Sequence, residues 1–371
     1  MKSRRIGAAL IAAVIVAAGV TTTARTQDAV GSVYSASNSA AGNEVLMFGR
    51  GANGALTLAQ AFSTGGLGSG DALGNQGGIV MTSDGKFMLV VNAGSNDISV
   101  LETTGDGLTL RDRTPSGGLR PISVTVQGRL VYVLNAGGGV GGADSVVGFR
   151  LSRGGALTMI AGSQRALSAT STGPAEVALS PDGESLIVTE KATNRVDVFP
   201  VDETGALGAL TSYASSGVTP FGFAFGKRDQ FFVSEAFGGA ANASAISSYQ
   251  LTSSATFGVV SPSVPTTETA ACWVVVSPDG RFLYTTNTGS GTVSGFSIKP
   301  DGTIALLDAN GVTATTGGGV TDVTMSENGR YLYALRPGAG AIAAFRIEEH
   351  GALKPLGSVS LPAGANGIVA R

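Results

Sequence analysis

Two glutamates, Glu176 and Glu190, are well placed in this sequence for acid–base chemistry. Glu176 opens an apolar run that leads to Ser180-Pro181-Asp182-Gly183, and Glu190 ends the run after that turn. An antiparallel hairpin brings its two open ends together, so the two carboxylates are predicted to be neighbours. Carboxylates in a partly desolvated place can separate their pKa values, so that one acts as acid and the other as base. The pair Glu190 and Glu176 is therefore the predicted catalytic pair.

Matching positions elsewhere in the chain carry further polar or ionisable residues. Arg120 and Arg336 are predicted to hold a substrate carboxylate or a developing oxyanion. The rest of the predicted substrate-binding set is Glu235, Asp322, Trp273, Asn92, Asn135 and Asn287. Two alternatives stay open. These groups pair with one another or with backbone amides, or a cation such as Ca²⁺ binds among Glu176, Glu190, Glu235 and Asp322.

The chain has one histidine and one cysteine, which excludes several chemistries. No intrachain disulfide is possible, and neither a structural zinc site nor a histidine-based catalytic unit is expected. His350 is predicted to lie in a solvent-facing outer turn, and Cys272 to be a buried structural thiol. The glycine-rich loop 135–142 leads into the predicted strand 145–150 rather than a helix, which excludes dinucleotide binding.

The elements that position these residues are repeats of about 49 residues. Each repeat reads as four short strands, with an Asp-Gly or Asn-Gly turn after the first and a glycine turn after the third. Turn glycines recur at Gly85, Gly128, Gly183, Gly280 and Gly329. A large side chain ends the third strand in six copies, which predicts packing between neighbouring blades: Phe48, Phe149, Phe199, Tyr249, Phe296 and Phe345.

A seventh copy is split between the two ends of the chain. Residues 33–58 supply its later pieces, and residues 367–370 resemble the first strand that these pieces lack. We therefore predict an all-β fold, a seven-bladed β-propeller with four antiparallel strands per blade. Its ring is closed by pairing the C-terminal strand with the N-terminal split blade.

Composition narrows the class of protein. Of 371 residues, 56 are glycine and only 13% are charged, with a formal net charge of −2, which excludes nucleic-acid binding through a strong basic field. Lys2, Arg4 and Arg5 precede an apolar run, so residues 1–24 are predicted to be a secretory signal peptide. We expect residues 25–371 to form one exported domain, secreted or periplasmic in a bacterium, with no membrane span after cleavage.

These repeats resemble the lactonase family of seven-bladed propellers, which includes bacterial 6-phosphogluconolactonases and fungal carboxymuconate-lactonizing enzymes. The resemblance rests on Gly173-Pro174, Ser180-Pro181-Asp182-Gly183, Val188-Thr189-Glu190 and the segments 196–199 and 204–207. It implies a lactone-type active site in which Glu190 matches the family's acidic residue. The family's Arg-His after Gly-Pro is Ala175-Glu176 here, and Thr288 stands where a late-blade arginine is common.

Two functions from different classes follow. The first is an exported, lactonase-like hydrolase or lactonizing enzyme for a small carboxylated or sugar-derived substrate, without a cofactor. The alternative is a non-catalytic propeller that binds a protein, glycan or cell-envelope partner. We expect a monomer in either case.

Overall fold

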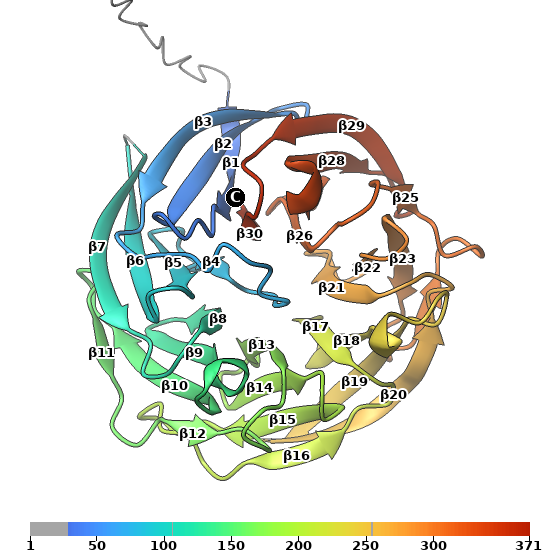
Figure 1. Ribbon diagram of the computed structural model, residues 1–371. Coiled ribbons are helices and arrows are strands. Elements are labelled where there is room, and N and C mark those ends of the chain that lie inside the picture. Colours follow the sequence, from blue (N-terminus) through green and yellow to red (C-terminus); the bar gives the residue numbers. More distant parts are fainter. Residues whose placement is uncertain (1–28, 106, 254) are drawn as a thin grey trace, which may run out of the picture.

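The computed structural model describes residues 29–105, 107–253 and 255–371, and these form seven antiparallel sheets arranged as blades around a channel. Figure 1 shows the ring along its axis, with each blade running outward from the centre. The predicted seven-bladed propeller is therefore confirmed. The predicted signal peptide, residues 1–24, lies outside the described residues.

The blades are numbered in chain order. Within each blade the strands are given from the innermost to the outermost, except in the split blade 1, whose innermost strand comes from the end of the chain. Blade 1 contains β1 (Ala29–Ala36), β2 (Glu44–Gly51), β3 (Leu56–Ser63) and β30 (Asn366–Ala370). Blade 2 contains β4 (Ile79–Met81), β5 (Phe87–Asn92), β6 (Asp97–Thr104) and β7 (Gly107–Pro115). Blade 3 contains β8 (Pro121–Gln127), β9 (Leu130–Ala136), β10 (Asp144–Leu151) and β11 (Leu157–Met159), with β12 (Arg165–Ala166) paired to β10.

The later blades follow the same plan. Blade 4 contains β13 (Pro174–Leu179), β14 (Ser185–Glu190), β15 (Arg195–Pro200) and β16 (Thr211–Ala214). Blade 5 contains β17 (Pro220–Phe225), β18 (Gln230–Glu235), β19 (Ala245–Ser253) and β20 (Thr256–Pro265). Blade 6 contains β21 (Ala271–Val276), β22 (Phe282–Asn287), β23 (Thr292–Ile298) and β24 (Ile304–Leu306), with β25 (Ala314–Thr315) paired to β23. Blade 7 contains β26 (Asp322–Met325), β27 (Tyr331–Arg336), β28 (Ala341–Ile347) and β29 (Leu353–Ser360).

The ring closes through the split blade, as predicted. β30 pairs antiparallel with β1, and Tyr34 faces Val369 in the register. The Ser35 hydroxyl adds a hydrogen bond of 2.7 Å to the Gly367 carbonyl. The two ends of the described chain are therefore joined inside one sheet, which removes the free edge that an open ring would leave.

The turns between first and second strands explain the repeated Ser-Pro-Asp-Gly sequence. In blade 4 the Ser180 hydroxyl accepts a hydrogen bond of 3.0 Å from the Ser185 amide, and the Asp182 carboxylate accepts one of 3.0 Å from the Glu184 amide. Gly183 has a φ of 78°, a conformation that favours glycine. Each of these residue types is therefore required by the turn itself rather than by a ligand.

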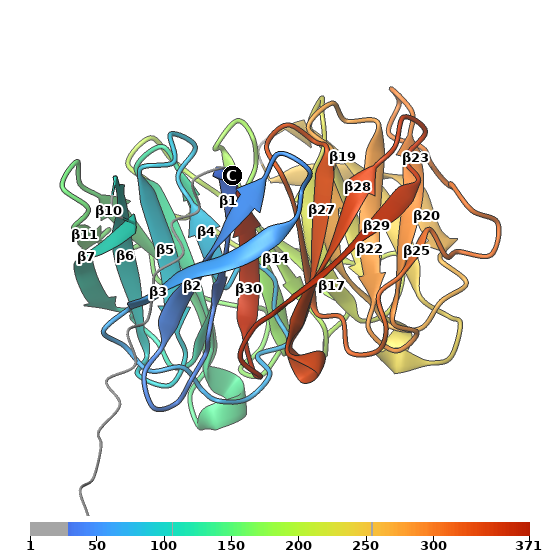
Figure 2. The ribbon, with the colours of Figure 1, turned by 90° about the horizontal axis from the view of Figure 1, so that it is seen from above.

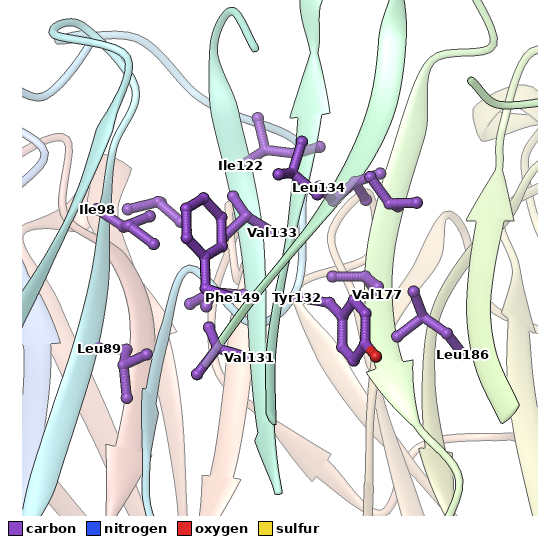
Figure 3. Close-up of a cluster of buried hydrophobic side chains, with 14 of the residues drawn as sticks. Leu89, Ile98, Ile122, Val131, Tyr132, Val133, Leu134, Phe149, Val177 and Leu186 are labelled. Carbon is purple, nitrogen blue, oxygen red and sulfur yellow. The ribbon is translucent and has the colours of Figure 1, made fainter. Parts of the chain in front are cut away.

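The hydrophobic core lies between neighbouring blades. Figure 3 shows Leu89 and Ile98 from blade 2 near Phe149 from blade 3, with Tyr132 of blade 3 near Val177 and Leu186 of blade 4. All six predicted third-strand aromatic residues are buried, which confirms their structural role. The Tyr132 hydroxyl also crosses the blade boundary, donating a hydrogen bond of 2.7 Å to the Gly205 carbonyl.

One face of the ring carries the starts of the first strands and the ends of the second strands. Three short 3-10 turns follow second strands on this face: η1 (Gly137–Val140), η2 (Phe237–Gly239) and η3 (Pro337–Ala339). Figure 2 shows these turns in green, yellow and red at the lower side of the ring. Among the described residues, no helix is long and apolar enough to cross a membrane.

Candidate active site at the channel mouth

Residues 71–77, here called the channel segment, link β3 to β4 and run into the central channel, as Figure 1 shows. The Gln76 side chain donates to the Val274 carbonyl (2.8 Å) and accepts from the Val274 amide (3.0 Å). The Gln76 amide donates to the Ala175 carbonyl at 3.1 Å, so the segment contacts blades 4 and 6. The channel segment therefore bridges the ring at its mouth, a feature that the sequence analysis did not predict.

Trp273 lies beneath this segment. Its ring nitrogen donates a hydrogen bond of 2.6 Å to the Asn75 carbonyl, and its side chain packs on Phe221 with a ring-centroid distance of 4.9 Å. Trp273 is only 5% exposed. The indole therefore supports the floor of the mouth and has little surface on which a ligand could stack.

Glu176 and Asp322 are buried on the first strands of blades 4 and 7. The Glu176 carboxylate accepts a hydrogen bond of 2.6 Å from the Phe223 amide of the next first strand. Burial raises the pKa of Glu176 well above its usual range, and the nearby charge of Asp322 adds to this effect. Burial also raises the pKa of Asp322 to about 8, although amides of Val323 and Ile368 oppose the shift. The raised pKa values favour the protonated form of both groups.

Glu190 does not join Glu176 at the channel. Its carboxylate accepts from the Ser168 amide (3.0 Å), the Ser168 hydroxyl (2.5 Å) and the Thr193 hydroxyl, all within or beside blade 4. The side chain is fully buried there. The expectation that the two glutamates form one pair at the mouth is wrong, because Glu190 points into the blade.

Glu190 instead lies beside Asp197 on the neighbouring strand β15. Burial, together with the hydrogen bond to Glu190, raises the pKa of Asp197 to about 8. Burial would also raise the pKa of Glu190, but hydrogen bonds from Asp197, Ser168 and Thr193 hold it below its usual range. Two buried carboxyls at this position therefore share a proton, carried by Asp197.

The other predicted residues at the ends of second strands also bond to groups within or beside their own blades, as Glu190 does. Asn92 donates to the Ser99 hydroxyl at 2.8 Å, and Asn287 donates to the Ser294 hydroxyl at 2.8 Å. Glu235 accepts from the Gly217 amide at 2.8 Å and from the Ser247 hydroxyl. Asn135 donates to the Ser116 carbonyl at 3.3 Å. These residues tie strands and links together, so their predicted position at the channel mouth is wrong.

Arg336 packs against Gly317 in the link between blades 6 and 7, where its guanidinium would clash with any added Cβ. Among the described residues, no group of three or more His, Cys, Asp or Glu is arranged to hold a metal ion. Glu190 binds Ser168 and Glu235 binds Gly217, each beside its own blade, so the structure does not bring together the four carboxylates of the calcium alternative, Glu176, Glu190, Glu235 and Asp322. Cys272 is buried, burial raises the pKa of its thiol to about 12, and His350 is exposed in the turn before β29.

Lys191, which the sequence analysis missed, lies at the channel mouth. Its ammonium group donates to the Gly74 carbonyl (2.5 Å) and the Pro174 carbonyl (2.8 Å), and lies 4.7 Å from the centre of the Phe221 ring. Burial, with a smaller effect from the charge of Arg120, lowers the pKa of Lys191 to about 8. Arg120 reaches the same channel segment, 3.5 Å from the Ala72 carbonyl. The mouth thus holds one arginine and one lysine that titrates near neutral pH.

Comparisons with known proteins agree with this architecture. The family model "Lactonase, 7-bladed beta-propeller" matches residues 41–140, 143–236 and 236–367. The periplasmic gluconolactonase of Pseudomonas aeruginosa has a TM-score of 0.71 at 16% identity, covering 91% of this chain and 98% of that one. A candidate 6-phosphogluconolactonase from Bacteroides fragilis has a TM-score of 0.70 at 17% identity, covering 93% and 99%.

A protein from Lactobacillus plantarum has a TM-score of 0.73 at 18% identity, covering 92% of this chain and 99% of that one. At these identities the similarity to solved structures establishes the fold alone. No curated protein matches the chain. The family model, however, covers most of the sequence. This protein therefore belongs to the lactonase family of seven-bladed β-propellers.

Proposed function

We propose that this protein is an exported lactonase-type enzyme that opens, or in reverse forms, a lactone of a small carboxylated or sugar-derived substrate. The observation that carries the proposal is the position of Lys191 beside Arg120 at the channel mouth. A titrating amine next to a permanent cation supplies both a base and an anion-binding group. Membership of the lactonase family supports the reaction class.

The hydrogen bonds of Lys191 favour a role as a general base. A neutral amine has two hydrogens, and the carbonyls of Gly74 and Pro174 accept two hydrogen bonds from this nitrogen. Its lone pair is then left to accept a proton from water, because both hydrogens are already engaged. Burial maintains a population of neutral amine near neutral pH, which an exposed lysine would lack.

The proposed reaction proceeds by addition and elimination. The water oxygen bonds to the lactone carbonyl carbon while Lys191 takes the water proton. The carbonyl oxygen becomes an oxyanion, which the Arg120 guanidinium stabilises. The bond to the ring oxygen then breaks, and that oxygen receives the proton held by Lys191. The product is a hydroxy acid, whose carboxyl proton passes to solvent.

A panel of γ- and δ-lactones, with and without carboxylate groups, tests this function through proton release in a pH-stat. We expect Lys191→Met to lower kcat/KM by at least about 100-fold while the melting temperature stays within a few degrees. Lys227→Met, on the opposite face, is the matched control and should leave the rate unchanged. If purified wild-type protein opens no lactone in the panel, the proposed function is wrong.

A second candidate function is binding of a protein, glycan or cell-envelope partner without catalysis. It is favoured by the carboxyls of Glu176 and Asp322, which bind backbone amides of neighbouring first strands and thus have a structural use already. Large apolar side chains are also exposed on the loops of the same face: Leu67, Leu119, Val140 and Val218. Absence of lactone turnover, together with saturable binding of an envelope component that Leu119→Ser abolishes, would select this function.

A further inference from the structure

The face opposite the channel mouth carries a repeated type of hollow. Each described hollow lies where the first hairpin turn of one blade meets the first and last hairpin turns of the next blade. The hollow between blades 3 and 4 has a volume of about 740 Å³, and the one between blades 2 and 3 about 330 Å³. Because the turns have the same architecture in each case, the hollows differ mainly in their side chains.

Charge separates these hollows clearly. The hollow between blades 3 and 4 is lined by four acidic residues and by no Lys or Arg: Asp182, Glu184, Asp202 and Glu203. The hollow between blades 2 and 3, here called the basic hollow, is lined by Lys86, Arg129 and Arg153, with Asp84 as its single acidic residue. The two hollows adjoin at Gly128, which lines both. Of these two adjoining hollows, the basic hollow is therefore the one that attracts an anion.

Backbone contacts position two of the three cations. Lys86 donates a hydrogen bond of 3.0 Å to the Arg153 carbonyl, and Arg129 donates one of 2.9 Å from Nε to the Leu151 carbonyl. The Arg129 bond uses one of five guanidinium donors, so its Nη groups are left for a ligand. Fixing a cation before a ligand arrives reduces the entropy that binding must overcome.

The acidic groups near the basic hollow already have partners. Asp84 accepts from the Thr82 hydroxyl (2.7 Å) and the Lys86 amide (2.9 Å), and these bonds hold its pKa below the usual range. Glu102 lies 2.5 Å from Arg111 and 3.5 Å from Lys86, and Arg111 balances its charge. Three lining cations against one lining carboxylate thus leave an excess of two positive charges.

A comparable hollow between blades 5 and 6 lacks this arrangement. It is lined by Lys227, Arg228, Arg281 and Lys299 and has a volume of about 390 Å³, but Arg281 forms an ion pair with Asp279 at 2.6 Å. That carboxylate belongs to the turn that lines the same hollow, so it competes directly with any anionic ligand. That hollow also keeps an excess of positive charge, but its carboxylate is paired with a lining cation, whereas Asp84 of the basic hollow is bound by the Thr82 hydroxyl and the Lys86 amide.

We propose that the basic hollow binds a small dianion with two oxyanion groups or one phosphate, held by Arg129, Arg153 and Lys86. Its volume is within the range of small-molecule sites, and Phe87 and Leu151 supply apolar wall for a carbon skeleton. Arginine guanidinium groups suit this role because they bind phosphate or carboxylate through paired donors. This site lies on the face away from Lys191, so it is independent of the proposed lactonase function.

Isothermal titration of the full mature chain with inorganic pyrophosphate and, separately, with succinate tests the proposal. We expect one of these two anions to bind with one-to-one stoichiometry and to bind more weakly as NaCl rises from about 20 to about 200 mM. Arg129→Gln combined with Arg153→Gln should weaken binding at least about tenfold. Arg346→Gln is the matched control, because Arg346 is exposed and paired with Glu348 at 2.7 Å.

The outcomes are distinct. Binding of pyrophosphate alone indicates a phosphate ligand, and binding of succinate alone a dicarboxylate, and either supports the site. The proposal fails if wild-type protein binds neither probe, or if Arg346→Gln weakens binding as much as the double variant. The Lys191→Met variant should bind the probe normally, so the test of anion binding is independent of lactone turnover.

Discussion

Lys191 differs from the residues at matching positions in the other blades. The residue that follows the polar end of a second strand is Ala93, Ala136, Ala236 and Thr288 in blades 2, 3, 5 and 6. Thr288 donates its hydroxyl to the Val320 carbonyl at 2.9 Å, and the alanines are too small to reach a ligand. Only blade 4, among these five, places a long ionisable side chain there, so the chemistry of the mouth depends on one blade.

The first prediction at the residue scale concerns the pH dependence of lactone opening. If Lys191 is the base, kcat/KM should rise about tenfold per pH unit below the lysine pKa and level off above about pH 8, where the amine is neutral. Initial rates measured between pH 5.5 and 9, corrected for uncatalysed opening, check this. Arg120→Lys should shift the midpoint little but lower the plateau, since lysine lacks the paired donors of arginine.

A rate that falls as pH rises through 8 would contradict this assignment. That result would indicate an acid as the essential group, and Glu176 and Asp322 would then become the candidates, because burial raises the pKa of both carboxyls.

Strand alternation explains why the sequence analysis found the right strand ends but the wrong side chains. Successive side chains on a strand point to opposite faces, so an error of one residue exchanges a buried position for a channel position. Glu190 and Lys191 are adjacent, and a single sequence gives no direct sign of which one faces the axis. The signal that existed was the contrast between Lys191 and the small residues after Asn92, Asn135 and Glu235.

At the element scale, the channel segment has the largest effect on the site. It belongs to no repeat, since it lies in the link between the split blade and blade 2, and repeat-based reasoning therefore could not place it. The Asn75 side chain donates to the Ile122 carbonyl of blade 3 and the Gln76 side chain to the Val274 carbonyl of blade 6, and Asn366 donates a hydrogen bond of 2.8 Å to the Asn75 side chain. A short link thus sets the depth and floor of the mouth.

Removing the Gln76 side chain tests this role. Gln76→Ala leaves the amide and carbonyl of buried Val274 without these partners, so we expect a loss of about 2–4 kcal/mol in unfolding free energy. Urea denaturation followed by Trp273 fluorescence measures it, because the indole contacts the neighbouring Asn75. Gln164→Ala, at an exposed position, is the control and should cost less than about 1 kcal/mol. Equal effects of the two variants would show that the segment does not brace the ring.

At the scale of the whole molecule, the sequence predicted the architecture well because every blade repeats the same requirements. The turn residues Ser180 and Asp182 are needed for local hydrogen bonds, and large side chains such as Phe149 are needed between blades. Such demands recur with a fixed period and are readable without a structure. A site formed by side chains from different blades has no period, so its geometry could not be read in the same way.

Several of the few charged residues in the ring are buried carboxyls, and their burial affects the stability of the whole molecule. Burial raises the pKa of Asp197 and of Asp322 to about 8, and it raises the pKa values of Glu176 and Glu235. Exposed acids behave in the opposite way, as hydrogen bonds and Arg281 hold the pKa of Asp279 at about 2 despite some desolvation. At pH values between the lowered pKa values of the exposed acids and the raised pKa values of the buried carboxyls, titration of the buried carboxyls should therefore determine how stability changes with pH.

Stability is accordingly predicted to decrease as pH rises from about 4 to about 8. Carboxyls with raised folded-state pKa values bind protons that the unfolded chain has already released in this range, so their contribution is complete below about pH 4 and is lost as pH approaches 8. We expect the melting temperature at pH 5 to exceed that at pH 8 by at least about 5 °C. Asp197→Ser, which introduces the residue found at the matching positions Ser99, Ser247 and Ser294, should reduce that difference, whereas Asp301→Asn at the surface should not. A melting temperature that rises steadily from pH 5 to pH 8 would mean that these carboxyls are ionised in the folded ring. That result would contradict the assignment of a shared proton to Glu190 and Asp197.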